Sequence, residues 1–191
     1  MIYKLEADFE NFYSFDFDID DLLGKMPGYS QRFRAKPRLS EWVEPVGQFY
    51  RGEGFTGDLE KIPDISIWAL GNLVINELAY ELLFENIRDA GEFLPVMVGG
   101  DKYYMFNTLQ VLNSDSVDSS SAVSVIDSGV HLGVSGVKVC KDLLSDVDIF
   151  KMKEEKLIHS FATDGFKRLC EDGGLTGLNF LNVNGVFNES V

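Results

Sequence analysis

Residues 72–112 read NLVINELAYELLFENIRDAGEFLPVMVGGDKYYMFNTLQVL, and this stretch decides the fold. Its first part, residues 72–90, predicts one long amphipathic helix, because apolar residues recur there at spacings of three and four. The expected buried face consists of Ile75, Leu78, Ala79, Leu82, Leu83 and Ile87. Gly91 follows at once. A glycine suits the left-handed position just past a helix end because it has no Cβ to clash there.

The second part of this stretch predicts a β-hairpin. Residues 91–98 (GEFLPVMV) and 102–112 (KYYMFNTLQVL) are typical of strands, since they are rich in β-branched and aromatic side chains. Gly99, Gly100 and Asp101 lie between them and supply the chemistry of a tight turn. The unit at the centre of the chain is therefore expected to be a helix followed by two antiparallel strands.

Further strand patterns flank this unit at residues 1–5, 46–52, 62–70, 122–127, 136–140 and 175–183. A second hairpin is expected over residues 148–152 and 156–162, with its turn at residues 153–155. Thr163 is a suitable N-cap for a short helix over residues 164–172, which would stop at the two glycines that follow.

These patterns together predict an α+β fold, with mixed or antiparallel sheets packed against one long central helix and a short C-terminal helix. The chain has 191 residues, contains no internal repeat and has no long flexible linker. We therefore expect a single domain over residues 1–191. A smaller N-terminal subdomain over residues 1–62 is the alternative.

The chain is strongly acidic, with 17 Lys and Arg residues against 31 Asp and Glu residues and a formal net charge of −14. Binding to nucleic acid or to an anionic membrane surface is disfavoured, because both need cationic side chains. The sequence contains no run of about 18 apolar residues, so no membrane span is predicted. The start of the chain lacks the basic and apolar blocks of a signal peptide. The charge either keeps the protein soluble or attracts a basic protein partner.

The densest acidic run is residues 15–21, FDFDIDD. Acidic and apolar residues alternate there with a period of two, which predicts a strand with its acids on one face. A calcium-binding loop is disfavoured, because Asp21 stands where the loop needs Gly and Pro27 stands where it needs Glu. The run is either a solvated face or a surface that contacts a partner. The candidate partner-binding residues are Asp16, Asp18, Asp20 and Asp21.

Residues 24–40 are expected to form a loop that carries the densest cations, Arg32, Arg34, Lys36 and Arg38. These cations either pair with the nearby acidic run or form a pocket for an anion. No glycine-rich loop leads into a helix there, so the phosphate-binding pattern is missing. The segment RGEGFTG at residues 51–57 resembles a phosphate loop only weakly, since it lacks the final GK[ST].

No pattern in the chain predicts catalysis, a metal site or a bound cofactor. The two histidines, His131 and His159, have no neighbours at metal-ligand spacing. His159 lies in an alternating pattern that favours a structural role, and His131 lies in a glycine-rich segment. Cys140 and Cys170 are 30 residues apart without a CxxC motif, which is typical of reduced thiols. Trp68 is expected to be a packing aromatic.

Several segments resemble the eleventh family of immunity proteins from bacterial polymorphic toxin systems, formerly a domain of unknown function. They agree with that family in order and spacing over roughly residues 1–183. The segments are MIYKLEADFENFYSF (1–15), IPDIS (62–66), LVINELAYELL (73–83), GEFLPV (91–96), YYMFN (103–107) and FKRLCEDGGLTGLNF (166–180). The resemblance implies a cytoplasmic protein, encoded beside a toxin, that neutralises this toxin by direct stoichiometric binding. It implies no catalytic residue.

Three hypotheses for the function remain open at this point. The first is an immunity protein whose acidic surface meets a basic toxin, and it requires no cofactor. The second is an enzyme that reverses a toxin's modification or acts on a small anionic ligand near Arg32, Arg34 and Arg38. The third is a structural or regulatory protein that works as a homo-oligomer. The resemblance favours the first.

Overall fold

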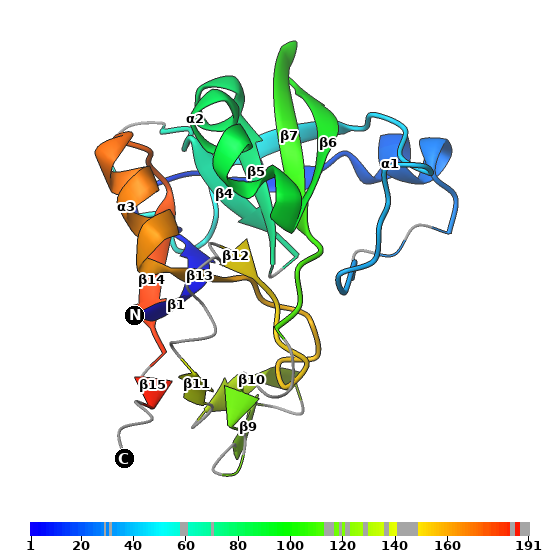
Figure 1. The fold of residues 1–191 in the computed structure, drawn as a ribbon. Coiled ribbons are helices and arrows are strands. Elements are labelled where there is room, and N and C mark those ends of the chain that lie inside the picture. The colour runs from blue at the N-terminus through cyan, green and yellow to red at the C-terminus, as the bar shows by residue number, and fades with distance from the viewer. Residues whose placement is uncertain are drawn as a thin grey trace.

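The computed structural model describes residues 1–28, 30, 32–57, 61–69, 71–112, 117–118, 120, 123–127, 130–135, 138–140, 149–183 and 186–187. Within these residues the chain forms an α+β fold dominated by sheets, as predicted (Figure 1). Its helices there are α1 (Ile19–Lys25), α2 (Glu77–Ile87) and α3 (Asp164–Asp172). A short 3-10 helix, η1 (Arg88–Ala90), continues α2.

The largest sheet has six strands in the order β2-β3-β6-β7-β5-β4. The pairing of β3 with β6 is parallel and the other pairings are antiparallel, so the sheet is mixed. The predicted hairpin is confirmed as β6 and β7, which are joined at two glycines of positive φ, Gly99 and Gly100. The strands are β2 (Ser14–Phe17), β3 (Val46–Tyr50), β4 (Ile65–Trp68), β5 (Asn72–Asn76), β6 (Gly91–Val98) and β7 (Asp101–Thr108).

The second sheet is antiparallel, with the order β12-β13-β1-β14. It confirms the predicted first and last strands as β1 and β14. The predicted pairing of residues 148–152 with 156–162 is confirmed in part, because β12 pairs with β13 but turns lie throughout residues 153–157. Residues 1–62 contribute strands to both large sheets. The strands are β1 (Ile2–Ala7), β12 (Ile149–Phe150), β13 (Phe161–Thr163) and β14 (Leu178–Asn182).

Two smaller sheets complete the described strands (Figure 1). The predicted strands near residues 122–127 and 136–140 are confirmed as β9 and β11. One sheet pairs β9 with β10, and the other has the order β15-β11-β8. Their strands are β8 (Val117–Asp118), β9 (Val123–Asp127), β10 (Val130–Ser135), β11 (Lys138–Cys140) and β15 (Val186–Phe187).

The prediction of one long central helix from residue 72 is wrong, because the first part of that segment is strand β5. This strand lies between β4 and β7 and is buried on both faces, with Leu73 and Ile75 in one core and Val74 in the other. A strand covered on both sides reads as a continuous apolar run rather than an alternating one. The helix begins only after Asn76, whose side chain accepts a hydrogen bond from the Ala79 amide at 2.8 Å.

Gly91 does not occupy the predicted left-handed position, since its φ of −175° is that of extended backbone. Its need for glycine has a different cause. A Cβ at Gly91 would collide with the Asn107 carbonyl oxygen and the Phe106 ring of the paired strand. By contrast, α3 has the predicted bounds: it begins after Thr163, although the Thr163 side chain makes no cap hydrogen bond, and it ends at Asp172 before Gly173 and Gly174, of which Gly174 has a φ of +65°.

The six-stranded sheet separates two hydrophobic cores. The first core joins one face of this sheet to α2, α3 and the second sheet, and Ala79, Leu83 and Phe166 are fully buried in it. The second core lies on the opposite face and contains Leu22 of α1 together with Phe33. In Figure 1, α2 and α3 lie on the left side of the molecule and α1 lies on the right. Helix α1 is therefore the outer cover of the second core.

Candidate functional site

The predicted acidic strand does not extend through residues 15–21, because β2 ends at Phe17 and α1 begins at Ile19. The prediction that Asp16, Asp18 and Asp20 share one strand face is therefore wrong. Asp18 is the N-cap of α1, and its carboxylate accepts a hydrogen bond from the Asp21 amide at 3.0 Å. Aspartate is a preferred N-cap residue, because its carboxylate can accept a hydrogen bond from a free backbone N–H at the start of a helix. The chain therefore becomes helical after Asp18 and does not continue as a strand.

Asp16 and Asp21 make further contacts that serve the fold. Asp16 accepts hydrogen bonds from the indole nitrogen of Trp68 at 2.9 Å and from the Phe17 amide at 2.8 Å. The carboxylate of Asp21 lies 2.9 Å from the Lys25 nitrogen and accepts from the Val46 amide at 2.8 Å. The bond from Lys25, followed by the one from Val46, lowers the pKa of Asp21. Trp68 is a buried packing residue, as predicted.

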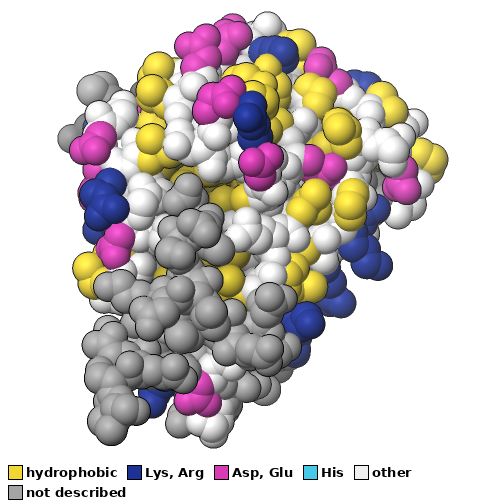
Figure 2. All heavy atoms as spheres, viewed as in Figure 1, with side chains coloured by type: hydrophobic (Ala, Val, Ile, Leu, Met, Phe, Trp, Pro, Cys, Tyr) yellow, Lys and Arg dark blue, Asp and Glu magenta, His cyan; other side chains and the backbone are white. Residues whose placement is uncertain are grey.

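The other two acids, Asp18 and Asp20, are exposed beside a group of exposed apolar side chains. Ile19 and Leu23 lie one helical turn apart on α1 and are 42% and 48% exposed. The segment 43–46 runs along the helix and adds Val43 and Val46, which are 48% and 38% exposed. We call these six residues the α1 surface. Figure 2 shows hydrophobic and acidic side chains together at the end where Figure 1 places α1.

One backbone hydrogen bond and one from a side chain hold the two parts of the α1 surface together. The Asp18 amide donates to the Val46 carbonyl at 2.9 Å, and the Lys25 side chain donates to the Glu44 carbonyl at 2.9 Å. The pairing of Phe17 with Gly47 places β3 beside β2 and so brings this segment to the helix. Sequence reasoning missed the apolar members, since the period of two suggested that Ile19 pointed inward.

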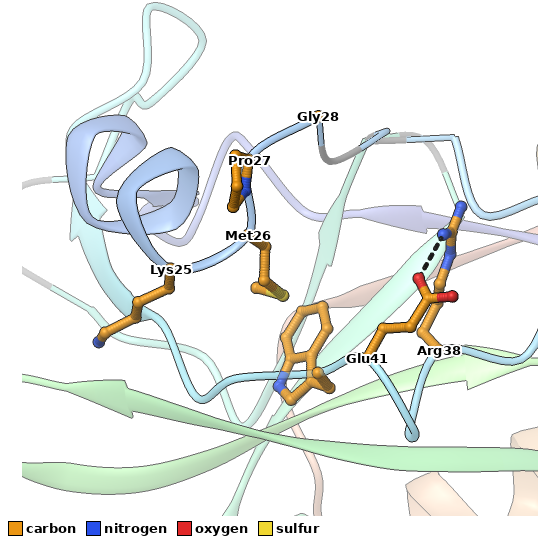
Figure 3. Close-up of a pocket in the computed structure, with 7 residues that line it drawn as sticks. Lys25, Met26, Pro27, Gly28, Arg38 and Glu41 are labelled. Atoms are coloured by element: carbon orange, nitrogen blue, oxygen red, sulfur yellow. Dashed lines mark ion pairs between the residues drawn. The ribbon is translucent and has the colours of Figure 1, made fainter.

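A pocket of about 260 Å³ lies at the end of α1 and adjoins the α1 surface through Lys25. In Figure 3, Met26 and Pro27 lie on one side of it, while Arg38 and Glu41 lie on the other as a loose ion pair of 3.6 Å. The ammonium group of Lys25 points away from that pair. The complete lining is Lys25, Met26, Pro27, Gly28, Arg38, Glu41 and Trp42. The Trp42 indole donates to the Pro95 carbonyl at 2.8 Å, which fixes the ring against β6.

The predicted basic cluster is divided between two places. Arg38 lines the pocket beside α1, whereas Arg32 and Arg34 line a separate depression with Lys151. Among the described residues, no ion pair joins the cations of residues 32–38 to the acids of residues 16–21. The ion pair of Arg38 is with Glu41, and that of Asp21 is with Lys25. The expected pairing between the two runs is therefore wrong.

The remaining candidates for chemistry are structural where they are described. The Nδ1 atom of His159 lies 3.1 Å from the Glu155 carboxylate, and both side chains are buried. His159 precedes β13 rather than lying in it. Cys170 faces the first core, and burial raises the pKa of its thiol to about 12. The side chains of His131 and Cys140 lie outside the described residues. Within the described part of the chain, no group of three or more potential metal ligands comes together.

None of the described helices is long and apolar enough to cross a membrane. No curated protein matches the chain. A family model, that of the immunity protein family (Imm11), matches residues 21–185. This range begins inside α1, at Asp21, and contains the rest of that helix, the whole pocket lining and most of both large sheets. The matched family is also the one that the sequence motifs resemble. Because the match covers well over half of the chain, the protein belongs to the immunity protein family Imm11.

Proposed function

We propose that this protein neutralises a bacterial toxin in the cytoplasm by direct stoichiometric binding, and that the α1 surface makes the contact. Membership of the immunity protein family supports a toxin as the partner. The observation that carries the choice of surface is the exposure of four apolar side chains, two on α1 and two on the adjoining segment 43–46, together with two exposed acids, Asp18 and Asp20.

The composition of the α1 surface suits a protein interface. Interfaces combine a central apolar patch, which loses its contact with water, with a polar rim that sets the orientation. Here Ile19, Leu23, Val43 and Val46 supply the apolar patch. Asp18 and Asp20 supply acidic neighbours, and the net charge of −14 favours a basic toxin. Asp16 and Asp21 position the surface through Trp68 and Val46 rather than meeting the toxin.

The pocket at the end of α1 gives the toxin a place to insert one side chain. The residues that dominate binding energy commonly fill such pockets near the centre of an interface. Met26, Pro27 and Trp42 provide apolar walls, and Glu41 provides a carboxylate that is largely exposed. We therefore infer that the contact extends from the α1 surface into this pocket.

The test of the proposed surface is co-expression with the toxin encoded by the neighbouring gene, followed by co-purification and measurement of Kd. The double variant Ile19→Ala with Leu23→Ala is expected to weaken binding at least about ten-fold, since it truncates two central contacts. The matched control is Leu78→Ala with Leu82→Ala, because these exposed leucines also lie one turn apart, on α2. A larger loss in the control than in the α1 variant would place the interface on α2 instead.

The charge contribution is tested separately. Asp18→Asn with Asp20→Asn removes two charges, and asparagine at position 18 keeps a good helix cap. The expected result is slower association at low salt, with a smaller effect at high salt. Glu77→Gln with Glu81→Gln is the control, because it removes the same charge from the exposed side of α2. Equal slowing in both variants would show that only the net charge matters.

Stoichiometry separates binding from catalysis. Direct neutralisation predicts that toxin activity falls to zero at one equivalent of this protein and remains there only while the complex persists. Protection by a small fraction of an equivalent would instead indicate an enzyme that acts on the toxin or on its product.

A further inference from the structure

A second hollow lies where the loop of residues 30–38 meets the segment 151–158. Its walls include Arg32, Arg34, Asn72, Lys151, Leu157 and Ile158, and it offers about 10 Å³ of free space. That is room for about one water-sized group. Lys and Arg side chains also follow the lower right edge of the molecule in Figure 2, on a protein whose net charge is −14. This depression is the cationic counterpart of the acidic α1 surface.

The buried cation of the depression is Lys151, which is only 1% exposed. Its ammonium group donates to the Ile158 carbonyl at 3.1 Å. Among the described residues, no carboxylate lies within 4.0 Å of this nitrogen, and the buried Glu155 pairs with His159 instead. A buried ammonium group that lacks an opposite charge is costly, and an anion that enters the depression would offset that cost.

Asn72 also lines the depression, and it lacks a hydrogen-bond donor rather than an anion. Its side chain is buried, with 2% of the residue exposed. Its side-chain oxygen has no hydrogen-bond partner among the described residues. A buried oxygen of this kind calls for a donor. The ligand that fits must therefore bring an anionic oxygen for Lys151 and an N–H or O–H group for Asn72.

The side chain between the two arginines anchors the backbone of their segment. Phe33 is 1% exposed and packs edge-on against Trp42 and Trp68, with ring centroids 6.1 and 6.3 Å away. Arg32 and Arg34 therefore start from a fixed segment on the rim. A pair of guanidinium groups is well suited to a planar carboxylate, which each can bind through two hydrogen bonds.

The backbone around the depression is also unusual. Three residues that line it, from three separate segments, are not glycine and yet have positive φ: Arg34 at 50°, Ala69 at 49° and Leu157 at 57°. Such conformations cost free energy and cluster at ligand-binding sites, where the surrounding structure maintains them. Their convergence supports a site shaped for a ligand.

We propose that this depression binds the C-terminal carboxylate of a polypeptide. The carboxylate lies on Lys151, Arg32 and Arg34, and the N–H of the same terminal residue donates to the side-chain oxygen of Asn72. A simple carboxylate such as acetate would leave Asn72 without its donor. A free amino acid would bring a charged ammonium group among three cations, so the neutral amide N–H of a peptide fits better.

Matched small ligands test the proposal on the full chain. N-acetylglycine has both the carboxylate and the amide N–H, N-acetylglycinamide lacks the carboxylate, and acetate lacks the amide. Binding is followed by NMR at the side-chain nitrogens of Asn72 and Lys151. N-acetylglycine is expected to bind in a saturable manner at least about ten-fold more tightly than either control or free glycine. Equal binding of N-acetylglycinamide would overturn the proposal, and tighter binding of free glycine would assign the site to amino acids instead.

The variant Lys151→Met is expected to weaken N-acetylglycine binding about ten-fold or more, because it removes the buried charge. Lys153→Met is the control, since Lys153 is exposed two residues away and carries the same charge. Arg34→Gln provides a second variant that leaves the interior untouched, and it is also expected to weaken binding. Equal losses for Lys151→Met and Lys153→Met would refute a specific site. Substitutions at Ile19 and Leu23 should not affect this binding, so the depression and the α1 surface are tested independently.

Discussion

Replacing Lys151 with methionine is expected to make the protein more stable near neutral pH. Lys151 is among the largest fully buried side chains, and its ammonium group has one described hydrogen bond, to the Ile158 carbonyl. Methionine has a similar length and carries no charge. The substitution therefore removes a buried cation while it preserves most of the packing around it.

The size of the effect follows from the pKa of Lys151, which burial lowers from 10.5 to about 8. Each unit corresponds to about 1.4 kcal/mol, so keeping the charge inside the folded protein costs about 3 kcal/mol near pH 7. The lost hydrogen bond to Ile158 offsets about 1 kcal/mol of this. We therefore expect a gain of about 2 kcal/mol in the free energy of unfolding for Lys151→Met.

The gain should disappear as the pH rises. Between about pH 8 and pH 10.5 the folded wild-type protein releases the Lys151 proton while its unfolded chain still holds one. Stability rises with pH wherever the unfolded chain binds more protons, so the wild type becomes more stable relative to the variant. The Glu155–His159 pair and the thiol of Cys170 are common to both proteins and cancel in the comparison.

The assay is urea denaturation of both proteins, followed by tryptophan fluorescence, at about pH 7 and about pH 9.5. Buffers without carboxylates are needed, because an anion bound at Lys151 would stabilise the wild type. Lys153→Met is the control and should change stability little at either pH. A wild type more stable than Lys151→Met at pH 7, or a difference that does not change with pH, would refute the reasoning.

Three further predictions concern the fold. Asn76→Ala should lower the free energy of unfolding by about 1 kcal/mol through loss of the α2 cap, and Asn76→Asp should largely retain it, as measured by urea denaturation. Gly71→Ala should lower the Tm sharply, because its Cβ would collide with the Ile158 carbonyl, while Gly24→Ala, with open space around it in α1, should be neutral or stabilising. In a Cys140→Ser background, Cys170 should react with a thiol reagent only on unfolding, since its thiol is buried and its pKa is raised to about 12.

The strands at the start, centre and end of the chain were predictable because their local patterns and turn residues agree. The β6–β7 hairpin is an example, since two glycines of positive φ join two runs typical of strands. Strand β5 was not predictable from periodicity, because it is covered on both faces and its apolar residues also fit a helical spacing. The asparagine at position 76 was the signal that should have divided the segment, as a preferred N-cap residue.

The candidate site was only half predictable. The acidic run pointed to the correct region, but its members have different roles, and these depend on partners distant in sequence. Asp16 meets Trp68, and Asp21 meets Val46, which reaches α1 only because β3 pairs with β2. The apolar part of the α1 surface comes from two segments that no local pattern connects. The pairing of strands brings these two segments together, and neither segment has a sequence pattern that predicts the contact.

The net charge of the sequence also did not predict the cationic depression, because a net charge sums over surfaces of opposite sign. The acidic α1 surface and the cationic depression share one set of packed aromatic rings. Trp68 donates to Asp16 beneath α1, it packs against Phe33 between Arg32 and Arg34, and it is followed by Ala69 in the wall of the depression. A rigid aromatic core can hold two oppositely charged sites close together without letting them pair. Within the described part of the chain neither Arg32 nor Arg34 forms an ion pair, and the proposed ligand would use these two cations.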